Sequence, residues 1–168
     1  MKQRHKEQDL QIRCVRYFRY SYPELAVLLE HPKNEVASGN RTEGAIAKVE
    51  GVQAGVADLI LHVPSSLWFI DGVRQEEPLI VHSLAIEMKT KTGRQSAEQK
   101  IFQRYFEAAG NMYVIVRSFE EFQNVVTNYV SGIPYHTHKK LNDLWLQIDK
   151  EQAEAAREEL QALINKQK

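Results

Sequence analysis

Three charged residues interrupt two apolar stretches of this chain, and their types and spacing could do chemistry. Asp58 precedes the apolar run LILHV, and Glu87 and Lys89 lie two positions apart at the end of LAIEMK. Residues i and i+2 of a strand point to the same face, roughly 6.5 Å apart along the chain. Glu87 and Lys89 would therefore project side by side, with Met88 behind them. If the two stretches pair as strands, the Asp58 carboxylate would join them.

Two carboxylates and an ammonium group on one face are typical of a metal site with a lysine that acts as a general base or stabilises charge. Carboxylate oxygens suit Mg²⁺ or Mn²⁺, which bind substrate phosphates and keep several waters. A bound metal makes water a better nucleophile and offsets charge on the attacked phosphate. Lys89 could hold that water or neutralise the developing charge. Gln99, at the start of the following predicted helix, could orient Lys89 or the water.

The same residues also have a purely structural interpretation. A buried ion pair between Glu87 and Lys89, or exposed charges at a strand end, would produce this spacing equally well. An acid-x-lysine at a strand end is a short pattern that matches many unrelated proteins. The spacing alone therefore leaves the metal site and the structural ion pair about equally supported.

The composition indicates one globular domain. The chain has 168 residues, of which 43% are hydrophobic and 26% charged, as in a folded protein with a sizeable core. No apolar run approaches the roughly 18–20 residues of a membrane span, and the basic N-terminus lacks the apolar segment of a secretory signal. We therefore expect a cytoplasmic protein with no membrane partner. The formal net charge is +0, so nucleic-acid binding would need a local basic patch.

Apolar periodicity predicts alternating helices and strands in the central part of the chain. Ser96 and Ser118 each begin a capping-box pattern, which predicts two helices that end near Gly110 and Gly132. Asp71-Gly72 is a hairpin signal within an expected connection. The order of elements predicts an α/β fold around a mixed sheet. The expected ranges are helix 8–30 with a second short helix opened by Pro23, strands 58–63, 79–89 and 113–116, and the connection 64–78.

The remaining segments are less regular. Residues 33–56 carry turn signals, with a brief helix over 44–50, and residues 133–148 show no clear pattern. His136 and His138 match no strong metal template and fit surface or partner contact better. Residues 149–168 predict an amphipathic helix that could pack on the body, pair with a second copy or fray. The basic residues of the first helix favour a solvated face over a nucleic-acid contact: Arg4, Lys6, Arg13, Arg16 and Arg19.

The spaced elements carry a family resemblance. The stretches GVQAGVADLIL, IEMKTKTGRQSAEQKIFQRYFEAAG and YVIVRSFEEF resemble the VRR-NUC branch of the PD-(D/E)XK nuclease superfamily. That family has glycines before a strand-opening aspartate, an acid-x-lysine at the end of the next strand and a serine-x-x-glutamine helix. The resemblance covers roughly residues 34–126. The family usually has proline before the aspartate, where this chain has Ala57.

The resemblance implies a restriction-endonuclease-like core, a central mixed sheet flanked by helices, with an extra C-terminal helix. It implies a nuclease domain over residues 1–148 and a separate charged helix over 149–168. Hydrolysis of DNA phosphodiester bonds with Mg²⁺ or Mn²⁺ is the implied activity. The implied catalytic residues are Asp58, Glu87, Lys89 and Gln99; the implied metal ligands are Asp58, Glu87 and the Met88 carbonyl, with Glu7 as the first-helix acid ahead of Glu24 and Glu35.

Stand-alone members of this branch look like small dimeric endonucleases that act on branched DNA and occur in phage and bacteria. By resemblance we expect a homodimer that binds DNA through a basic rim. The rim candidates are Lys48, Lys91, Arg94, Lys100, Arg104 and Arg117. Two alternatives are a nucleic-acid-binding module that keeps the nuclease fold without catalysis, and a partner protein that uses its C-terminal helix.

Overall fold

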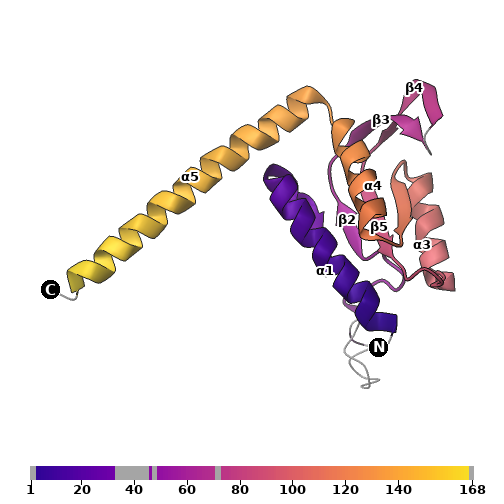
Figure 1. The fold of residues 1–168 in the computed structure, drawn as a ribbon, viewed down its shortest axis with the longest axis horizontal. Coiled ribbons are helices and arrows are strands. Elements are labelled where there is room, and N and C mark those ends of the chain that lie inside the picture. Colours follow the sequence, from indigo (N-terminus) through magenta and orange to yellow (C-terminus); the bar gives the residue numbers. More distant parts are fainter. Residues whose placement is uncertain (1–2, 33–45, 47–48, 71–72, 167–168) are drawn as a thin grey trace.

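The computed structural model describes residues 3–32, 46, 49–70 and 73–166 (Figure 1). The elements in chain order are α1 (Gln3–Ser21), the 3-10 helix η1 (Pro23–Leu28), β1 (Leu29–Glu30), β2 (Leu59–Leu61), β3 (Ser65–Ile70), β4 (Val73–Val81), β5 (Leu84–Met88), α3 (Ala97–Ala108), β6 (Met112–Val116), α4 (Phe119–Ser131) and α5 (Tyr135–Lys166).

The central sheet has four strands in the order β1-β2-β5-β6. β1 and β5 both run antiparallel to β2, while β6 runs parallel to β5. The parallel pair is joined through α3, as a crossover between parallel strands requires. The predicted mixed sheet flanked by helices is therefore confirmed.

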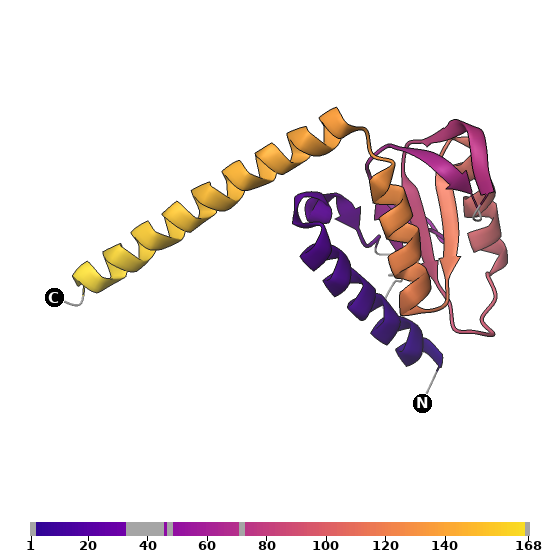
Figure 2. The ribbon, with the colours of Figure 1, turned by 45° about the horizontal axis from the view of Figure 1, so that its top comes forward.

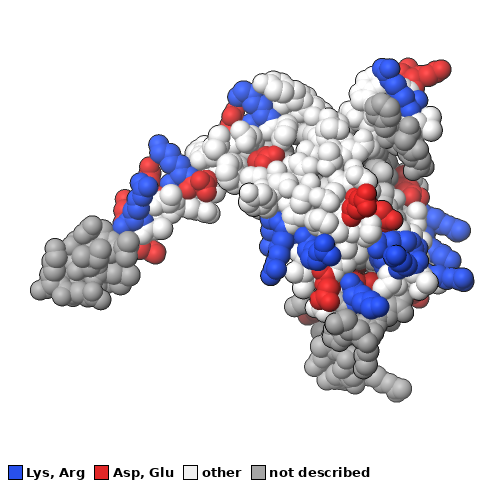
Figure 3. All heavy atoms as spheres, viewed as in Figure 1, with Lys and Arg blue, Asp and Glu red and all other residues white. Residues whose placement is uncertain are grey.

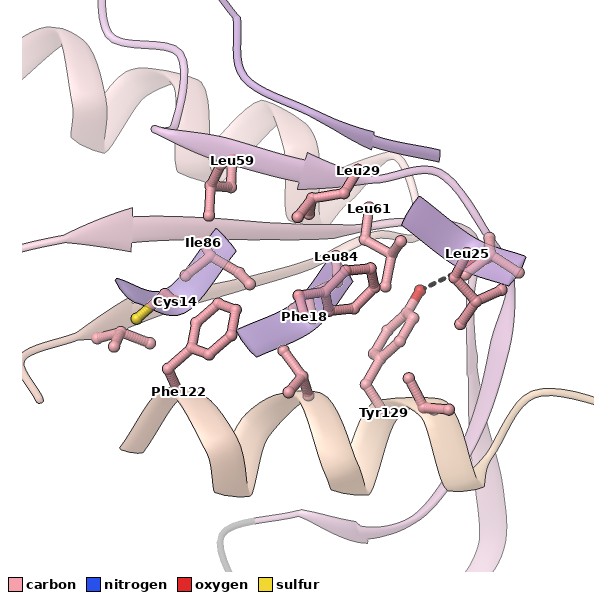
Figure 4. Packing of buried hydrophobic residues seen from close by; sticks show 14 of the residues in the cluster. Cys14, Phe18, Leu25, Leu29, Leu59, Leu61, Leu84, Ile86, Phe122 and Tyr129 are labelled. Carbon is pink, nitrogen blue, oxygen red and sulfur yellow. Dashed lines mark hydrogen bonds between the residues drawn. The ribbon is translucent and has the colours of Figure 1, made fainter. Parts of the chain in front are cut away.

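The helices cover the two faces of this sheet unequally (Figure 2). α1 and α4 cover one face, where Phe18, Phe122 and Tyr129 pack against Leu84 and Ile86 in the main core (Figure 4). The Tyr129 hydroxyl donates a hydrogen bond of 2.7 Å to the Val63 carbonyl within this core. α3 covers the other face with a smaller cluster, in which Phe102 and Phe106 pack on Ala57, Ile60, Ala85 and Tyr113.

β3 and β4 form a separate two-stranded hairpin beside the sheet. Ser65 holds this hairpin to the end of α4, because its hydroxyl donates a hydrogen bond of 2.6 Å to the Tyr129 carbonyl. The Ser66 amide likewise donates to the Gly132 carbonyl at 2.8 Å. A side chain at Gly132 would lie 2.4 Å from the Ser65 hydroxyl, so glycine allows this close approach.

α5 leaves the body as one long helix (Figure 1). Its first turns are fixed by Leu141, which packs on the main core, and by His138, whose Nε2 lies 2.7 Å from Glu24 Oε1. Every residue from 149 to 159 is exposed. No helix within the described ranges is both long and apolar enough to span a membrane.

Several predicted boundaries were wrong. The expected strand 79–89 is two strands, because the chain leaves the hairpin after Val81 and enters the central sheet at Leu84. The expected connection 64–78 contains most of that hairpin, although Asp71-Gly72 lies outside the described residues. The C-terminal helix begins at Tyr135 rather than at residue 149. Its regular start follows Pro134. The apolar residues of 133–148 do not form one buried stripe, since Leu144, Leu146 and Ile148 are exposed, so the segment gave no clear helical pattern.

The N-terminal prediction was partly right. α1 ends at Ser21, and Pro23 opens a short helix, as expected, because proline's fixed φ suits a first helical turn. That helix is of the 3-10 type, and Leu29–Glu30 then form an edge strand rather than more helix. The predicted helix over 44–50 falls mostly outside the described residues.

Candidate active site

The two strands bring Asp58 and Glu87 to the same place. β2 and β5 pair with Leu59 opposite Ile86, so Asp58, one residue earlier, is level with Glu87. Residues directly opposite in an antiparallel pair project to the same face. Because Ala85 belongs to the cluster under α3, Glu87, two residues on, faces α3 as well. The predicted convergence of the two carboxylates on one face is therefore seen in the fold.

Glu87 is held by three side chains. It is only 1% exposed, although it is charged. Its Oε1 accepts hydrogen bonds from Lys89 Nζ at 2.6 Å and from Gln99 Nε2 at 2.5 Å. Its Oε2 accepts from the Tyr113 hydroxyl at 3.2 Å. This buried carboxylate thus has donors on both oxygens, as buried polar groups require.

Gln99 has two roles at once. As the third residue of α3, its Oε1 accepts from the Ser96 amide at 2.9 Å, while the Gln99 amide donates to the Ser96 hydroxyl at 3.2 Å. Both bonds of the predicted capping box are therefore present. Because its side-chain oxygen accepts from the helix cap, its NH₂ group is directed at Glu87. The helix cap fixes which end of the amide meets the carboxylate.

A close backbone contact sets the position of this helix start. Gly55 has φ of +82°, and a Cβ there would lie 2.4 Å from the Glu98 carbonyl carbon. Only glycine accommodates both the left-handed backbone and this contact. This glycine, which precedes the Asp58 strand, thus allows the first turn of α3 to approach closely.

Asp58 is held by the Met88 backbone on one side and by the His31 side chain on the other. Its Oδ2 accepts a hydrogen bond from the Met88 amide at 2.7 Å, and its own carbonyl oxygen accepts one from His31 Nδ1 at 2.6 Å. In an extended strand the N–H and C=O groups of one residue point toward the same neighbouring strand. The Met88 carbonyl therefore faces the Asp58 side of β5.

Burial makes both carboxylates reluctant to ionise, and the charge of Asp58 adds to this effect at Glu87. The pKa of Glu87 is raised, first by burial and then by the nearby Asp58 carboxylate, with Lys89 acting in the opposite direction. The pKa of Asp58 is raised by burial, while the Met88 amide and the charge of Lys89 act to lower it. A cation would stabilise two neighbouring buried carboxylates whose pKa values are raised in this way.

Glu7 and Arg117 hold the loop that follows β5. Glu7 Oε1 accepts a hydrogen bond from the Thr90 amide at 2.8 Å. Arg117 donates through one guanidinium nitrogen to the carbonyls of Thr90 at 2.6 Å and Gly93 at 2.9 Å. The loop between Lys89 and α3 is thus fixed from α1 on one side and from the end of β6 on the other.

The other predicted residues lie at the edge of the site or outside it. Lys91 and Arg94 are exposed on the loop held by Glu7 and Arg117. Lys100 and Arg104 are exposed on α3. Glu24, the second candidate for the first-helix acid, contacts His138 rather than the site residues. Lys48 and Glu35 lie outside the described residues.

Sequence reasoning missed two residues of this site. Tyr113 faces Glu87 because the parallel register pairs Ala85 with Tyr113, on the face covered by α3. A tyrosine at the start of the aliphatic strand YVIV gave only a weak signal. His31 reaches the Asp58 carbonyl from the end of β1, a strand that the sequence did not predict.

The possible metal ligands are two carboxylates and one carbonyl. Within the part of the chain that the structure describes, no three His, Cys, Asp or Glu side chains gather closely enough to hold a metal ion. Glu7 therefore does not complete a three-carboxylate set with Asp58 and Glu87. The oxygen-only donors Asp58, Glu87 and the Met88 carbonyl still suit a hard cation that keeps several waters.

Comparison with known proteins supports the fold. No protein-family model matches the chain, and no curated protein is similar enough to be matched. A solved structure titled "VRR_NUC domain protein" superposes with a TM-score of 0.56 and 19% sequence identity, over 74% of this chain and 88% of that chain. The fold expected from the VRR-NUC resemblance is thereby confirmed.

Proposed function

We propose that this protein is a metal-dependent deoxyribonuclease that hydrolyses DNA phosphodiester bonds. The observation that carries the proposal is the pairing of Asp58 and Glu87 on one face of the sheet, with Lys89 bonded to Glu87 at 2.6 Å. Such a group is costly to bury without a cation, and enzymes rather than binding modules have use for it. The VRR-NUC-like fold supports the same conclusion.

The residues present fit a divalent cation of the Mg²⁺ or Mn²⁺ type. Asp58, Glu87 and the Met88 carbonyl would hold it, leaving other coordination positions to water and phosphate. When bound, the cation would lower the pKa of a water and offset phosphate charge. Its charge would also offset the burial that raises the pKa of both carboxylates and the repulsion by Asp58 that raises the pKa of Glu87.

The chain's own residues would prepare the site for that cation. Gln99 and Tyr113 hold the Glu87 carboxylate, so that it does not reorganise when substrate arrives. Lys89 has a side chain only 12% exposed, which strengthens its field at a phosphate. Its ammonium group would stabilise the negative charge that develops on the attacked phosphate or hold the attacking water.

A basic rim would hold the DNA backbone without reading its sequence. Lys91, Arg94, Lys100 and Arg104 are exposed around the site and are suited to phosphate contacts. The geometry favours supporting roles for Glu7 and Arg117, since both are bonded to the backbone of the Thr90–Gly93 loop. Lys48 stays a candidate from the sequence.

The resemblance extends this proposal in four respects. It favours an endonuclease over an exonuclease, selectivity for branched DNA, a homodimer as the working unit and a cytoplasmic location. Each stays a prediction. The dimer is tested by sedimentation at several protein concentrations, and selectivity by the substrates below.

The test is a cleavage panel over linear, flapped and four-way DNA with Mg²⁺, Mn²⁺ or EDTA. We expect cutting with either metal and none in EDTA. Glu87→Ala and Lys89→Met should each reduce the rate by about 10²–10³-fold, the usual effect of removing a charge-stabilising group. Circular dichroism should show both variants folded.

Matched controls separate the site from general charge effects. Lys150→Met removes an exposed lysine of α5 and should leave the rate unchanged. Equal cutting by the parent and by both site variants would show that the site is wrongly assigned. Salt-sensitive DNA binding without cutting under any metal would support the non-catalytic binding module instead.

A further inference from the structure

The outer face of α1 carries a stripe of arginines around an exposed tyrosine. The α1 stripe consists of Arg13, Arg16, Arg19 and Tyr20. Neighbours three and four residues apart lie on one side of a helix, so these four side chains are adjacent. All three arginines are exposed, and the Tyr20 side chain is 88% exposed. Figure 3 shows Lys and Arg side chains gathered over α1 and toward the edge of the body near α3.

Packing and ion pairing do not account for this stripe. Within the described residues, none of its three arginines forms a salt bridge with a carboxylate. Arg13 lies over the Phe119 ring at 4.8 Å, while Arg16 and Arg19 project from the surface. Neighbouring Tyr17, in contrast, is partly buried and packs on Phe119 and Phe122. Tyr20 therefore exposes a large ring where the fold does not require one.

The stripe is connected to the candidate active site through the same helix. Glu7, near the start of α1, is bonded to the Thr90 amide in the loop after Lys89. A helix rises about 1.5 Å per residue, so Tyr20 lies about 20 Å along the axis from Glu7. That distance corresponds to about six nucleotides at about 3.4 Å each, the spacing along one strand of B-DNA, and to fewer nucleotides in an extended single strand. Thirteen residues make about 3.6 helical turns, so the stripe lies on the side of α1 away from Glu7, and a strand leaving the site would reach it by passing around the helix.

The charge distribution favours a nucleic acid as the occupant. The last half of α1, residues 10–21, contains three arginines and no acid. The balancing charge lies in α5, where residues 149–159 include five acidic and two basic residues. Residues 10–21 thus carry a net charge of +3 and residues 149–159 a net charge of −3. An aromatic ring among cations is the arrangement by which proteins bind single strands, since every base offers a face for stacking.

We propose that the α1 stripe binds an unpaired DNA segment that leads away from Asp58 and Glu87. The Tyr20 ring stacks on a base, and Arg13, Arg16 and Arg19 contact phosphates. A duplex would present no open base face to Tyr20, so the stripe distinguishes unpaired from paired DNA. This inference rests on the proposed nuclease function and specifies which part of a branched substrate the protein holds.

The test measures binding in EDTA, where no cutting occurs, by fluorescence anisotropy of a labelled single strand and of the matching blunt duplex. Tyr20→Ala should weaken single-strand binding about tenfold and duplex binding less than about twofold, because stacking acts on open bases only. Tyr20→Phe keeps the ring and should bind like the parent. Tyr135→Ala removes another tyrosine, 81% exposed, and should have no effect.

The phosphate contacts of the arginines are tested by the salt dependence of single-strand binding. Arg16→Gln should reduce the slope of log affinity against log salt by about 0.7, the value for one phosphate contact on a single strand. The same substitution of an exposed arginine on α5, Arg157→Gln, should leave the slope unchanged.

Three outcomes would overturn the proposal. One is unchanged single-strand affinity in Tyr20→Ala, and another is equal weakening for single strand and duplex. The third is loss of concentration-dependent self-association in Tyr20→Ala or Arg16→Gln without a change in DNA affinity, which would make the stripe an interface between copies. Stripe-dependent binding by a protein that never cuts would instead contradict the nuclease function alone.

Discussion

The side chains on the two faces of strand β5 have different surroundings. Leu84, Ile86 and Met88 point into the main core under α1 and α4 and are almost fully buried. Ala85 and Glu87 point the other way, beneath α3, where the cluster is small and Glu87 meets Lys89, Gln99 and Tyr113. One face is apolar and well packed, whereas the other is polar and buries charge. Stability should therefore depend on the first face and activity on the second.

The largest effect should come from the apolar face. Phe122 is fully buried in α4 and packs edge-on to Tyr17. Phe122→Ala should lower the free energy of unfolding by about 3–5 kcal/mol, from lost burial and the cavity left behind. Urea denaturation measures this loss. The cleavage rate per folded molecule should stay near that of the parent; a rate that fell with the site geometry intact would show that the two faces are coupled.

A substitution at Gly55 tests the backbone contact that positions α3 over the polar face. Gly55→Ala would place a Cβ 2.4 Å from the Glu98 carbonyl carbon, so the start of α3 must move. We expect a loss of about 1–3 kcal/mol in stability from overpacking, together with slower cleavage because Gln99 moves with the helix. Denaturation and cleavage assays measure the two effects.

The control is Gly51→Ala, which shares the left-handed backbone, with φ of +92°, but has nothing within 4 Å of its Cβ. It should lose a smaller amount of stability, from backbone strain alone, and keep the parent cleavage rate. Equal losses of activity in both glycine variants would mean that the contact with α3 is unimportant.

The sequence predicted the parts of the fold that local patterns determine. The capping box at Ser96 correctly located α3, and the period of a strand correctly placed Glu87 beside Lys89. Gln99 was expected to orient Lys89 or the water, and its side chain bonds Glu87 directly. Predictions of strand boundaries failed where contacts between segments remote in sequence determine the boundary. His82 and Ser83 separate β4 from β5 because they bond to the Gly110–Met112 turn, which is remote in sequence.

The two serine-capped helices show the same limit within one motif. Ser96 and Gln99 form both capping bonds, whereas Ser118 receives only the Glu121 amide. The Glu121 carboxylate turns instead to the Arg117 amide at 2.6 Å. Identical patterns thus end in different bonds. His31 and Tyr113 were missed for a similar reason, since strand pairing alone brings them to the site.

Substitutions at Ser96 and Gln99 distinguish a role in helix stability from a role in catalysis on the polar face. Ser96→Ala removes the capping hydroxyl and should cost about 0.5–2 kcal/mol of stability while cleavage persists. Gln99→Ala removes the cap and the bond to Glu87, and should also slow cleavage or weaken metal affinity about 10–100-fold. Thermal melts and metal titrations of cleavage measure the two. Equal cleavage by the two variants would restrict Gln99 to the helix cap.

The smallest effect should be a gain, and it concerns the charge of Asp58. Burial raises the pKa of this carboxyl, so the folded state binds its proton more tightly than the unfolded state. Stability is then lost as pH rises from the ordinary carboxyl value through the raised one. Asp58→Asn removes the charge, and its amide oxygen can still accept from the Met88 amide. In EDTA at neutral pH we expect it to melt about 2–4 °C higher, a gain of about 1 kcal/mol.

The advantage of Asp58→Asn should disappear in acid, where the parent carboxyl is already protonated. Added Mg²⁺ should raise the melting temperature of the parent more than that of the variant, because only the parent has the second carboxylate to bind it. A variant that melts lower than the parent at neutral pH without metal would mean that the ionised Asp58 stabilises the fold. The polar face would then be an ion-pair network that stabilises the fold. The two faces of β5 would differ in composition but not in function.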